Sequence, residues 1–311
     1  MRYFFDKEKD WLAARKPDVT SVDVAAIFGL HPYKSRYQLW AEKSGLSEVE
    51  FEENTFTRWG RRLQIPVGQG ICEDEGWMGY DLSGVYMRHP ALALGCSYDL
   101  EAHCRDRGKI DLEIKIAESF SEELGWTKKT VPMMYEFQIQ LQLHMAAVNA
   151  EPFDLGCIGT LGRRQATRLY FREYDAGLGA MIDEEVHAFW QSVKDGTPPP
   201  PDFSLDGALL EKLAKPVRMG EACNLSLNNR AVDLVCSWKA LDDEAKPMRD
   251  KMAEIDAQKK SIKAEVHAMM GDAETAIIGD FIVSAKTQTS EEKFINEFSF
   301  RRFDIKKRKG K

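Results

Sequence analysis

The side chains most able to do chemistry lie between residues 95 and 115. Asp99 ends the run Gly-Cys-Ser-Tyr-Asp, and Glu113, Ile114 and Lys115 follow further along the chain. One carboxylate, followed by a carboxylate and an amine two residues apart, can hold a hard divalent cation beside a phosphate, and the lysine can then steer an attacking water. The spacing therefore predicts a metal-assisted hydrolytic site. On this segment alone, the alternative interpretation is a hairpin with a charged, solvated face.

Two adjacent strands are needed to bring these side chains together. Between Lys109 and Ile116 apolar residues alternate strictly with polar ones, which is the period of a half-buried strand. This period puts Asp111, Glu113 and Lys115 on the opposite face. The turn signal at 105–108 then predicts that Asp99 sits on the partner strand of a hairpin.

A helix predicted over 132–148 adds polar groups. Tyr135, Gln138 and Gln142 are spaced i, i+3 and i+7, so they share one face of this helix. Amide and phenol groups on one stripe can contact a phosphate or a water on a metal. A solvated helix face is the alternative.

The remaining pattern sets the organisation. Further helices are predicted over 22–28, 37–44, 59–76 and about 176–195, and strands over 153–161 and 167–174. Mixed elements around a central hairpin indicate an α+β or α/β core. Four prolines at 198–201 cannot continue the preceding helix and favour an extended spacer. We therefore expect a first domain over 1–205 and an accessory region over 206–311.

The accessory region changes character. Apolar residues recur at alternating spacings of four and three from Leu234 to Met269, with Lys259 in one slot. Pro247 is expected to start a second helix after Asp242 and Asp243, which predicts a helical hairpin or short coiled coil, with a core-packing helix as the alternative. Two strands near 276–286 and 296–305 and a basic tail should follow.

Composition bounds the class of protein. The chain has 311 residues, a net charge of −7 and six cysteines without metal-ligand or CxxC spacing, which read as reduced thiols of a cytosolic protein. No apolar run reaches membrane-spanning length, and the amino terminus has no signal-peptide pattern. The acidic balance argues against a general polyanion binder, although a local basic channel is compatible with DNA.

The motifs, in their order, resemble the lambda-exonuclease / YqaJ-type viral recombinase family, phage alkaline nucleases of the PD-(D/E)xK superfamily. The resemblance covers roughly 8–203. It is carried by Ser97-Tyr98-Asp99, Glu113-Ile114-Lys115, Trp126, Pro132, Tyr135, Gln138, Gln140, Gln142 and Leu143, by 21–30 with Leu39-Trp40, and by Trp59-Gly60-Arg61-Arg62-Leu63. It implies a restriction-endonuclease-like core, a central mixed sheet flanked by helices, with a helical or coiled-coil and β-hairpin appendage.

The resemblance also implies roles at the site. Asp99, Glu113 and the backbone carbonyl of Ile114 would hold Mg²⁺ or Mn²⁺, which activates the attacking water and stabilises the leaving oxygen. Lys115 would orient that water or act as its base, with a lowered pKa, and Gln138 would help position it. The family commonly has Glu where this chain has Gln64, which could reach the metal only through water. We therefore expect weaker cation binding, at one of two sites. Tyr98 replaces the family's proline.

DNA contacts and partners follow by the same resemblance. Arg15 and Ser97 would grip a terminal 5′-phosphate. Arg61, Arg62 and Lys128 would line the duplex channel, with Tyr135 and Gln142 near the phosphates. The expected assembly is a homo-oligomeric ring, a trimer, that takes double-stranded DNA ends and works with a single-strand annealing protein in the cytoplasm of a bacterial host, encoded by a phage or prophage.

The leading prediction is a Mg²⁺-dependent 5′–3′ exonuclease that degrades linear double-stranded DNA in recombination and leaves 3′ single-stranded overhangs. Two alternatives remain open. One is a structure-specific or restriction-type endonuclease of the same fold. The other is a catalytically weakened DNA-binding or adaptor module, in which Gln64 has disabled the metal site and the carboxy-terminal helices recruit a partner.

Overall fold

The structure is a computed structural model that describes residues 1–47, 54–117, 125–162, 167–214 and 222–285. Two compact units divide between Ala214 and Lys215, and each is described by itself. All six cysteines are free thiols, as expected. No helix among the described residues is long and apolar enough to cross a membrane.

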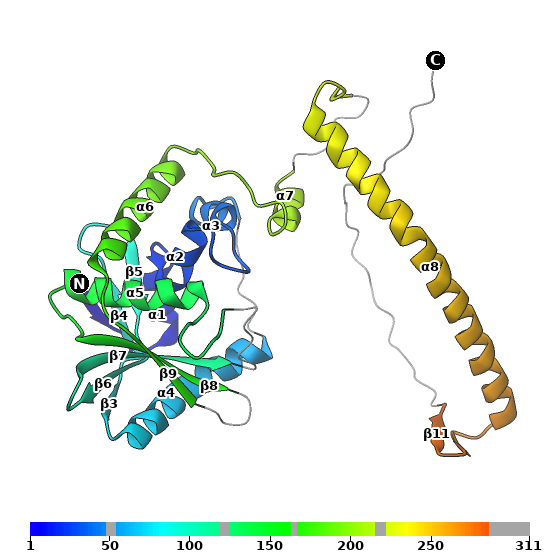
Figure 1. Ribbon diagram of the computed structural model, residues 1–311, viewed down its shortest axis with the longest axis horizontal. Helices are drawn as coiled ribbons and strands as arrows, with labels where there is room; N and C mark the ends of the chain where they lie inside the picture. Colours follow the sequence, from blue (N-terminus) through cyan, green and yellow to red (C-terminus); the bar gives the residue numbers. More distant parts are fainter. Residues whose placement is uncertain (48–53, 118–124, 163–166, 215–221, 286–311) are drawn as a thin grey trace. The chain divides into compact units, whose positions relative to one another are not determined.

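A five-stranded mixed sheet forms the centre of the first unit (Figure 1). Its strands lie in the order β3 (Met78–Asp81), β6 (Leu100–Cys104), β7 (Gly108–Ala117), β8 (Leu155–Gly162) and β9 (Thr167–Arg172). The strand β7 pairs antiparallel with β6, through the turn that the sequence predicts, and parallel with β8. The predicted fold class, a mixed sheet flanked by helices, is confirmed.

Helices cover both faces of this sheet. On one face α4 (Thr55–Glu75) packs Ile71 and Cys72 against the apolar side of β6 and β7. Gly68 permits this close approach, because a Cβ at this position would collide with the side chain of Leu100. On the other face α5 (Met133–Val148) packs Ile139 against Ile158 of β8. The central strands are therefore buried on both sides.

A second, four-stranded sheet packs with the remaining helices. Its order is β1 (Arg2–Phe4), β4 (Val85–Arg88), β5 (Leu94–Ser97) and β2 (Val19–Thr20). With it lie α1 (Glu8–Arg15), α2 (Ser21–Ile27), α3 (Arg36–Lys43) and α6 (Ala176–Lys194), and a core that includes Leu39, Leu94, Leu141 and Phe189 joins α5 to this layer. The sequence analysis does not anticipate β1 to β4 or α1, since strands of two to four residues carry no readable period.

The alternative interpretation of β7 as a strand with a charged, solvated face is wrong. Asp111 is 0% exposed and Glu113 is 3% exposed, because α5 lies over that face of the sheet. For the same reason the solvated-face alternative for α5 is wrong, since Gln138 and Gln142 are buried against the sheet. The polar stripe of β7 therefore faces the polar stripe of α5.

The first unit continues beyond the four prolines into α7 (Gly207–Leu213). The buried carboxylate of Asp206 accepts hydrogen bonds from the Ser35 hydroxyl at 2.5 Å and from the Asp202 amide at 2.7 Å. Leu209 packs against the core of the first unit. These contacts tie the segment after the prolines to the helical layer around α3.

The second unit contains one long helix, α8 (Asn229–Met270), and a hairpin of β10 (Thr275–Ile278) and β11 (Phe281–Ser284). The prediction that Pro247 starts a second helix is wrong: α8 runs through it without a break. Gly279, with φ +59°, forms the hairpin turn. The single strand predicted near 276–286 is therefore a hairpin of two short strands. The strand predicted near 296–305 lies outside the described residues.

Candidate active site

Asp99 lies where two strands of the central sheet separate. Pairing between β6 and β7 begins at Leu100 opposite Leu112, while β7 continues alongside β8 to Ala117. Beyond the pairing with β6, the amide of Ile114 donates a hydrogen bond of 2.8 Å to Oδ2 of Asp99 instead. The side-chain carboxylate thus replaces the missing strand, and it is held at a fixed point of the β7 backbone.

Glu113 is held from three sides. Its Oε1 accepts hydrogen bonds of 2.7 Å from Lys115 Nζ and of 2.7 Å from Gln138 Nε2. Its Oε2 accepts one of 2.8 Å from Gln142 Nε2. The spacing of two along β7 and of four along α5 explains this convergence, because both spacings keep side chains on one face. The orientation of this buried carboxylate is therefore set by its neighbours.

The electrostatics of the site follow from burial and like charge. Burial, followed by the nearby Glu113 carboxylate, raises the pKa of Asp99 well above its ordinary value, although Lys115 and the Ile114 amide oppose this. Burial alone would lower the pKa of Lys115, but the carboxylates of Glu113 and Asp99 outweigh it, so this pKa is raised. The lowered pKa that the sequence analysis expects for Lys115 refers to the site with a cation beside it, and it stays a prediction.

The donor set suits a hard divalent cation. Asp99 and Glu113 supply carboxylate oxygens, and Lys115, paired with Glu113 at 2.7 Å, offsets part of their charge. The buried Oε1 of Gln142 has no hydrogen-bond partner among the described residues. An all-oxygen set with excess negative charge fits Mg²⁺ or Mn²⁺ better than a soft metal. Asp99, Glu113 and the carbonyl of Ile114 could hold such an ion.

Gln64 reaches this site from α4. Its Nε2 lies 3.3 Å from Oδ2 of Asp99, the same oxygen that accepts from Ile114. A glutamine can donate to a carboxylate where a glutamate could not, so Gln64 stabilises the charge of Asp99 and adds none of its own.

A second polar group adjoins the first. Trp11 of α1 donates from Nε1 to the hydroxyl of Ser97 at 3.0 Å, and the Arg15 guanidinium lies 4.1 Å from the Trp11 ring centroid. Gln142 Nε2, which binds Glu113, also donates to the Ser97 carbonyl at 2.9 Å. The structure therefore links Arg15 and Ser97 through Trp11. The sequence analysis missed Trp11, and its signal was the i, i+4 spacing from Arg15.

The other residues predicted to bind DNA differ in their contacts and in their exposure. Arg61 forms an ion pair with Glu8, and Arg62 lies 5.4 Å from the ring of Trp59 on the same helix, α4. The Lys128 side chain is exposed in the turn over 127–130. The ring of Tyr135 lies 4.8 Å from Lys115 Nζ, which places an aromatic face directly against the site lysine.

A second set of potential metal ligands consists of His89, His144 and Asp183, whose ligand atoms lie within 4.8 Å of one another. The amides of Ala91 and Leu92 donate to Nδ1 of His89 at 3.1 and 3.0 Å. Burial lowers the pKa of His89, so its ring is neutral and carries its proton on Nε2, toward Asp183. That proton occupies the position a metal would need. We interpret this group as a polar contact between α5, α6 and the loop after β4.

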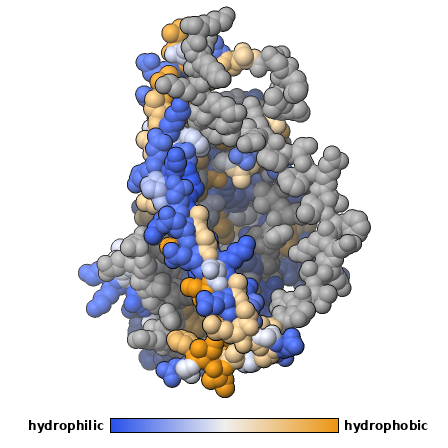
Figure 2. Space-filling model, turned by 90° about the vertical axis from the view of Figure 1, so that its right-hand side faces the viewer, coloured by the Kyte–Doolittle hydropathy of each residue, from blue (hydrophilic) through white to orange (hydrophobic). Residues whose placement is uncertain are grey.

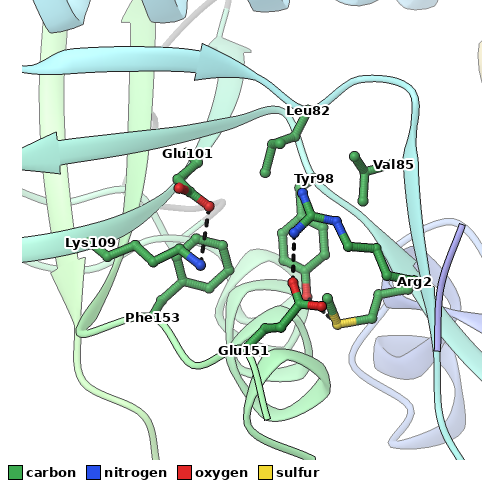
Figure 3. A pocket seen from close by; sticks show the side chains of 9 residues that line it. Arg2, Leu82, Val85, Tyr98, Glu101, Lys109, Glu151 and Phe153 are labelled. Atoms are coloured by element: carbon green, nitrogen blue, oxygen red, sulfur yellow. Dashed lines mark hydrogen bonds and ion pairs between the residues drawn. The ribbon is translucent and has the colours of Figure 1, made fainter. Parts of the chain in front are cut away.

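A small cavity lies beside Tyr98 (Figure 3). Two ion pairs line it, Arg2 with Glu151 at 2.6 Å and Lys109 with Glu101 at 3.1 Å. Within each ion pair the two charges offset each other. The Tyr98 hydroxyl donates a hydrogen bond to the carbonyl of Gln142 at 2.9 Å. The Tyr98 hydroxyl thus supports the backbone behind the site, and the buried Nε of Arg2 has no hydrogen-bond partner among the described residues.

The chain is similar in sequence to known proteins. The family described as the YqaJ-like viral recombinase domain matches residues 10–149. The protein YqaJ of Bacillus subtilis (strain 168) is 24% identical over 316 residues, which span 96% of this chain and 93% of that protein.

Two solved structures are also similar. An alkaline exonuclease (LHK-Exo) from Laribacter hongkongensis has 23% identity and a TM-score of 0.49, over 66% of this chain and 100% of its own. A phage-related exonuclease from Haemophilus somnus 129PT has 12% identity and a TM-score of 0.41, over 57% and 94%. The family match spans Gln64, Asp99, Glu113, Lys115, Gln138 and Gln142. Residues 10–149 of this chain match the YqaJ-like viral recombinase domain family.

Proposed function

We propose that this protein is a metal-dependent deoxyribonuclease that degrades linear double-stranded DNA from its 5′ ends and leaves 3′ single-stranded overhangs. The observation that carries the proposal is the convergence of Asp99, which directly precedes β6, with Glu113 and Lys115 of β7. The match of residues 10–149 to a viral recombinase domain family supports a role in phage or prophage recombination.

Asp99, Glu113 and the carbonyl of Ile114 would hold Mg²⁺ or Mn²⁺. When bound, the cation would polarise the scissile phosphate and lower the pKa of the attacking water. The protein's own part is to keep both carboxylates oriented: the Ile114 amide and Gln64 hold Asp99, while Gln138 and Gln142 hold Glu113. Side chains fixed in this way need no reorganisation as the reaction proceeds.

Lys115 would orient the attacking water. Its raised pKa keeps the ammonium protonated at neutral pH, so it donates hydrogen bonds and offsets negative charge near the phosphate. In this state it has no lone pair with which to accept a proton. Without a cation beside it, Lys115 would therefore orient the water, while a bound cation would lower its pKa and leave the role of base open. Gln138, bonded to the same Glu113 oxygen, supports its position.

Arg15 and Ser97 would bind the terminal 5′-phosphate. Their connection through Trp11, and from Ser97 through Gln142 to Glu113, supports a phosphate subsite next to the carboxylates. Arg61, Arg62 and Lys128 would contact the duplex further along, with Tyr135 beside the reacting strand.

The same proposal includes the assembly and the setting. The working form would be a homo-oligomeric ring, a trimer, threaded by the duplex, that acts in the bacterial cytoplasm with a single-strand annealing protein. Within it, 1–205 would carry the nuclease and 206–311 would be the accessory region.

Comparison of linear with covalently closed circular duplex DNA tests the exonuclease assignment. We expect Mg²⁺-dependent release of nucleotides from linear DNA with a 5′-phosphate, slower release without that phosphate, and none from the closed circle. Cutting of the closed circle would instead indicate an endonuclease of the same fold.

A catalytically weakened DNA-binding module is the second candidate, and Gln64 is the observation that favours it. This residue supplies an amide where a carboxylate would add charge for a cation. Calorimetric titration with Mn²⁺ separates the two: heat of binding together with nucleotide release supports the nuclease, whereas DNA binding without either supports the module.

A further inference from the structure

Helix α8 carries a long apolar stripe that remains exposed in the second unit. None of its 42 residues is buried. Leu241, Met248 and Ile262 are 65%, 64% and 61% exposed, and Figure 2 shows hydrophobic residues among charged ones along this helix. The stripe consists of Leu234, Trp238, Leu241, Ala245, Met248, Met252, Ile255, Lys259, Ile262, Val266 and Met269. Contiguous exposed apolar surface of this length marks an interaction site.

The spacing of the stripe identifies the geometry of its partner. Steps of four and three residues alternate without interruption from Leu234 to Met269, which is the seven-residue repeat of a left-handed coiled coil. In heptad letters, Trp238 takes position a and Leu241 position d. Pro247 then takes position c, on the side away from the stripe, so its ring stays clear of a partner helix.

The charges beside the stripe identify the partner as a second copy of this chain. In a parallel, in-register pair, each g position faces the next e position of the other helix. Glu244 then meets Arg249 of the partner subunit, and Lys251 meets Asp256 of the partner subunit. Symmetry forms each of these pairs twice.

The remaining flanking pairs set no like charges together. Ser237 faces Asp242 of the partner subunit, and Gln258 faces Lys263 of the partner subunit. An antiparallel pair that overlaps the whole stripe would also join opposite charges, such as Arg249 with Asp256 of the partner subunit, but it would bring Glu244 beside Glu265 of the partner subunit. Charge therefore favours the parallel arrangement.

Lys259 interrupts the stripe at an a position. In the parallel, in-register coil the Lys259 side chains of the copies share one layer; their long stems can cover apolar surface while the ammonium groups reach solvent, at some cost in stability, and such a residue fixes the register. Existing contacts of the flanking charges are local and exposed: Arg249 with Asp242 at 2.9 Å and Lys251 with Glu254 at 3.2 Å. Exposed pairs of this kind contribute little and do not prevent re-pairing across an interface.

We propose that α8 joins copies of this chain through a parallel, in-register coiled coil. The interface buries the apolar stripe of one helix against the same stripe of the other. It lies outside the residues assigned to catalysis, so it holds or fails independently of the nuclease activity.

Disulfide trapping of the full-length chain tests the proposal. In a background with the exposed Cys223 and Cys236 changed to serine, Ile255→Cys places a thiol at a d position, where identical residues of a parallel pair face each other. Ala257→Cys, at f on the opposite side of the helix, is the matched control. We expect at least about tenfold more reducible dimer from Ile255→Cys under mild oxidation.

Charge reversal then tests register and specificity. Glu244→Arg in the Ile255→Cys background should reduce the dimer yield several-fold, and adding Arg249→Glu should restore it, because the pair re-forms with opposite signs. Digestion of linear DNA by these variants should equal that of the unsubstituted chain. Equal trapping at 255 and 257, or a yield that does not respond to Glu244→Arg, would overturn the proposal, whether the stripe packs antiparallel, against the first unit or against another protein.

Discussion

The carboxylate of Asp99 accepts a hydrogen bond of 2.8 Å from the backbone amide of Ile114. The bond exists because the pairing of β6 with β7 ends at Leu100. Leu100 lies opposite Leu112, which is two residues before Ile114 on β7. This separation exposes the stretch of β7 that carries Glu113 and Lys115. The strand junction thus positions the site, and α5 fixes its side chains from above the sheet.

Gln64→Glu should exchange stability for cation affinity. Without metal, the new carboxylate loses the donor to Asp99 and adds like charge, so the unfolding free energy should fall by about 1–3 kcal/mol in EDTA. With Mn²⁺, the added charge should tighten binding about tenfold, or about 1.4 kcal/mol. Calorimetry and thermal unfolding measure both. Gln64→Leu is the control, since it loses the donor without adding charge; equal affinities in the two variants would contradict the account.

Gln142→Leu should weaken the fold as well as the site. Gln142 donates to both the Ser97 carbonyl and Glu113 Oε2, so its loss leaves a buried carboxylate with one partner fewer. The expected cost is about 1–3 kcal/mol in urea unfolding. As a control, Gln191→Leu at an exposed position of α6 should change stability by less than about 0.5 kcal/mol. If both variants were equally stable, Gln142 would not be the structural link proposed here.

The period of β7 and the turn after β6 could be predicted from sequence, because alternation and turn residues are local signals. The burial of the polar face could not. Whether Glu113 meets water or a helix depends on α5, which lies more than fifteen residues further along the chain. In α5 every residue from Phe137 to Ala146 is buried, so no apolar stripe marks the side that faces the sheet.

The candidate site shows the same division. Asp99, Glu113 and Lys115 were identified by type and spacing, and the structure brings them together. Trp11 was missed, since its contact with Ser97 joins residues 86 positions apart. The raised pKa of Lys115 in the absence of a cation depends on which charges surround the amine in three dimensions, so local sequence does not give it.

Gly68→Ala should destabilise the protein through the contact of α4 with the sheet. The added methyl would meet the Leu100 side chain, and overpacking of this kind costs about 1–3 kcal/mol. Gly70→Ala on the same helix is a matched control, because nothing lies within 4 Å of its Cβ position. It should stabilise by about 0.5–1 kcal/mol through helix propensity. Urea unfolding compares the two, and equal effects would contradict the packing described for α4.

Asp111→Asn should flatten the pH dependence of stability in EDTA. Burial, with Glu113 and Asp99, raises the pKa of Asp111 well above its ordinary value, and neither of its oxygens has a hydrogen-bond partner among the described residues. A raised carboxyl pKa means that the folded state keeps a proton that the unfolded state releases. Stability is therefore greatest below the ordinary carboxyl pKa and falls as pH rises toward the folded pKa, by up to about 1.4 kcal/mol per pH unit for each such group.

Unfolding measured from about pH 5 to about pH 8 checks this expectation. The wild-type chain should lose stability across this range, and Asp111→Asn should lose less. Asp106→Asn, in the exposed turn before β7, should follow the wild-type curve. A steeper slope in Asp111→Asn than in wild type would contradict the assigned burial of this carboxyl.

The most direct measurement is digestion of end-labelled linear duplex DNA by wild type and Glu113→Gln, in Mg²⁺ and in EDTA. Glutamine keeps the size of the side chain but removes the charge that the proposed cation needs, so unfolding curves should stay similar while Mg²⁺-dependent release falls at least about a hundredfold. Release by wild type should disappear in EDTA. Undiminished digestion by Glu113→Gln, or digestion that persists in EDTA, would contradict the assignment of Asp99, Glu113 and Lys115 as the catalytic centre.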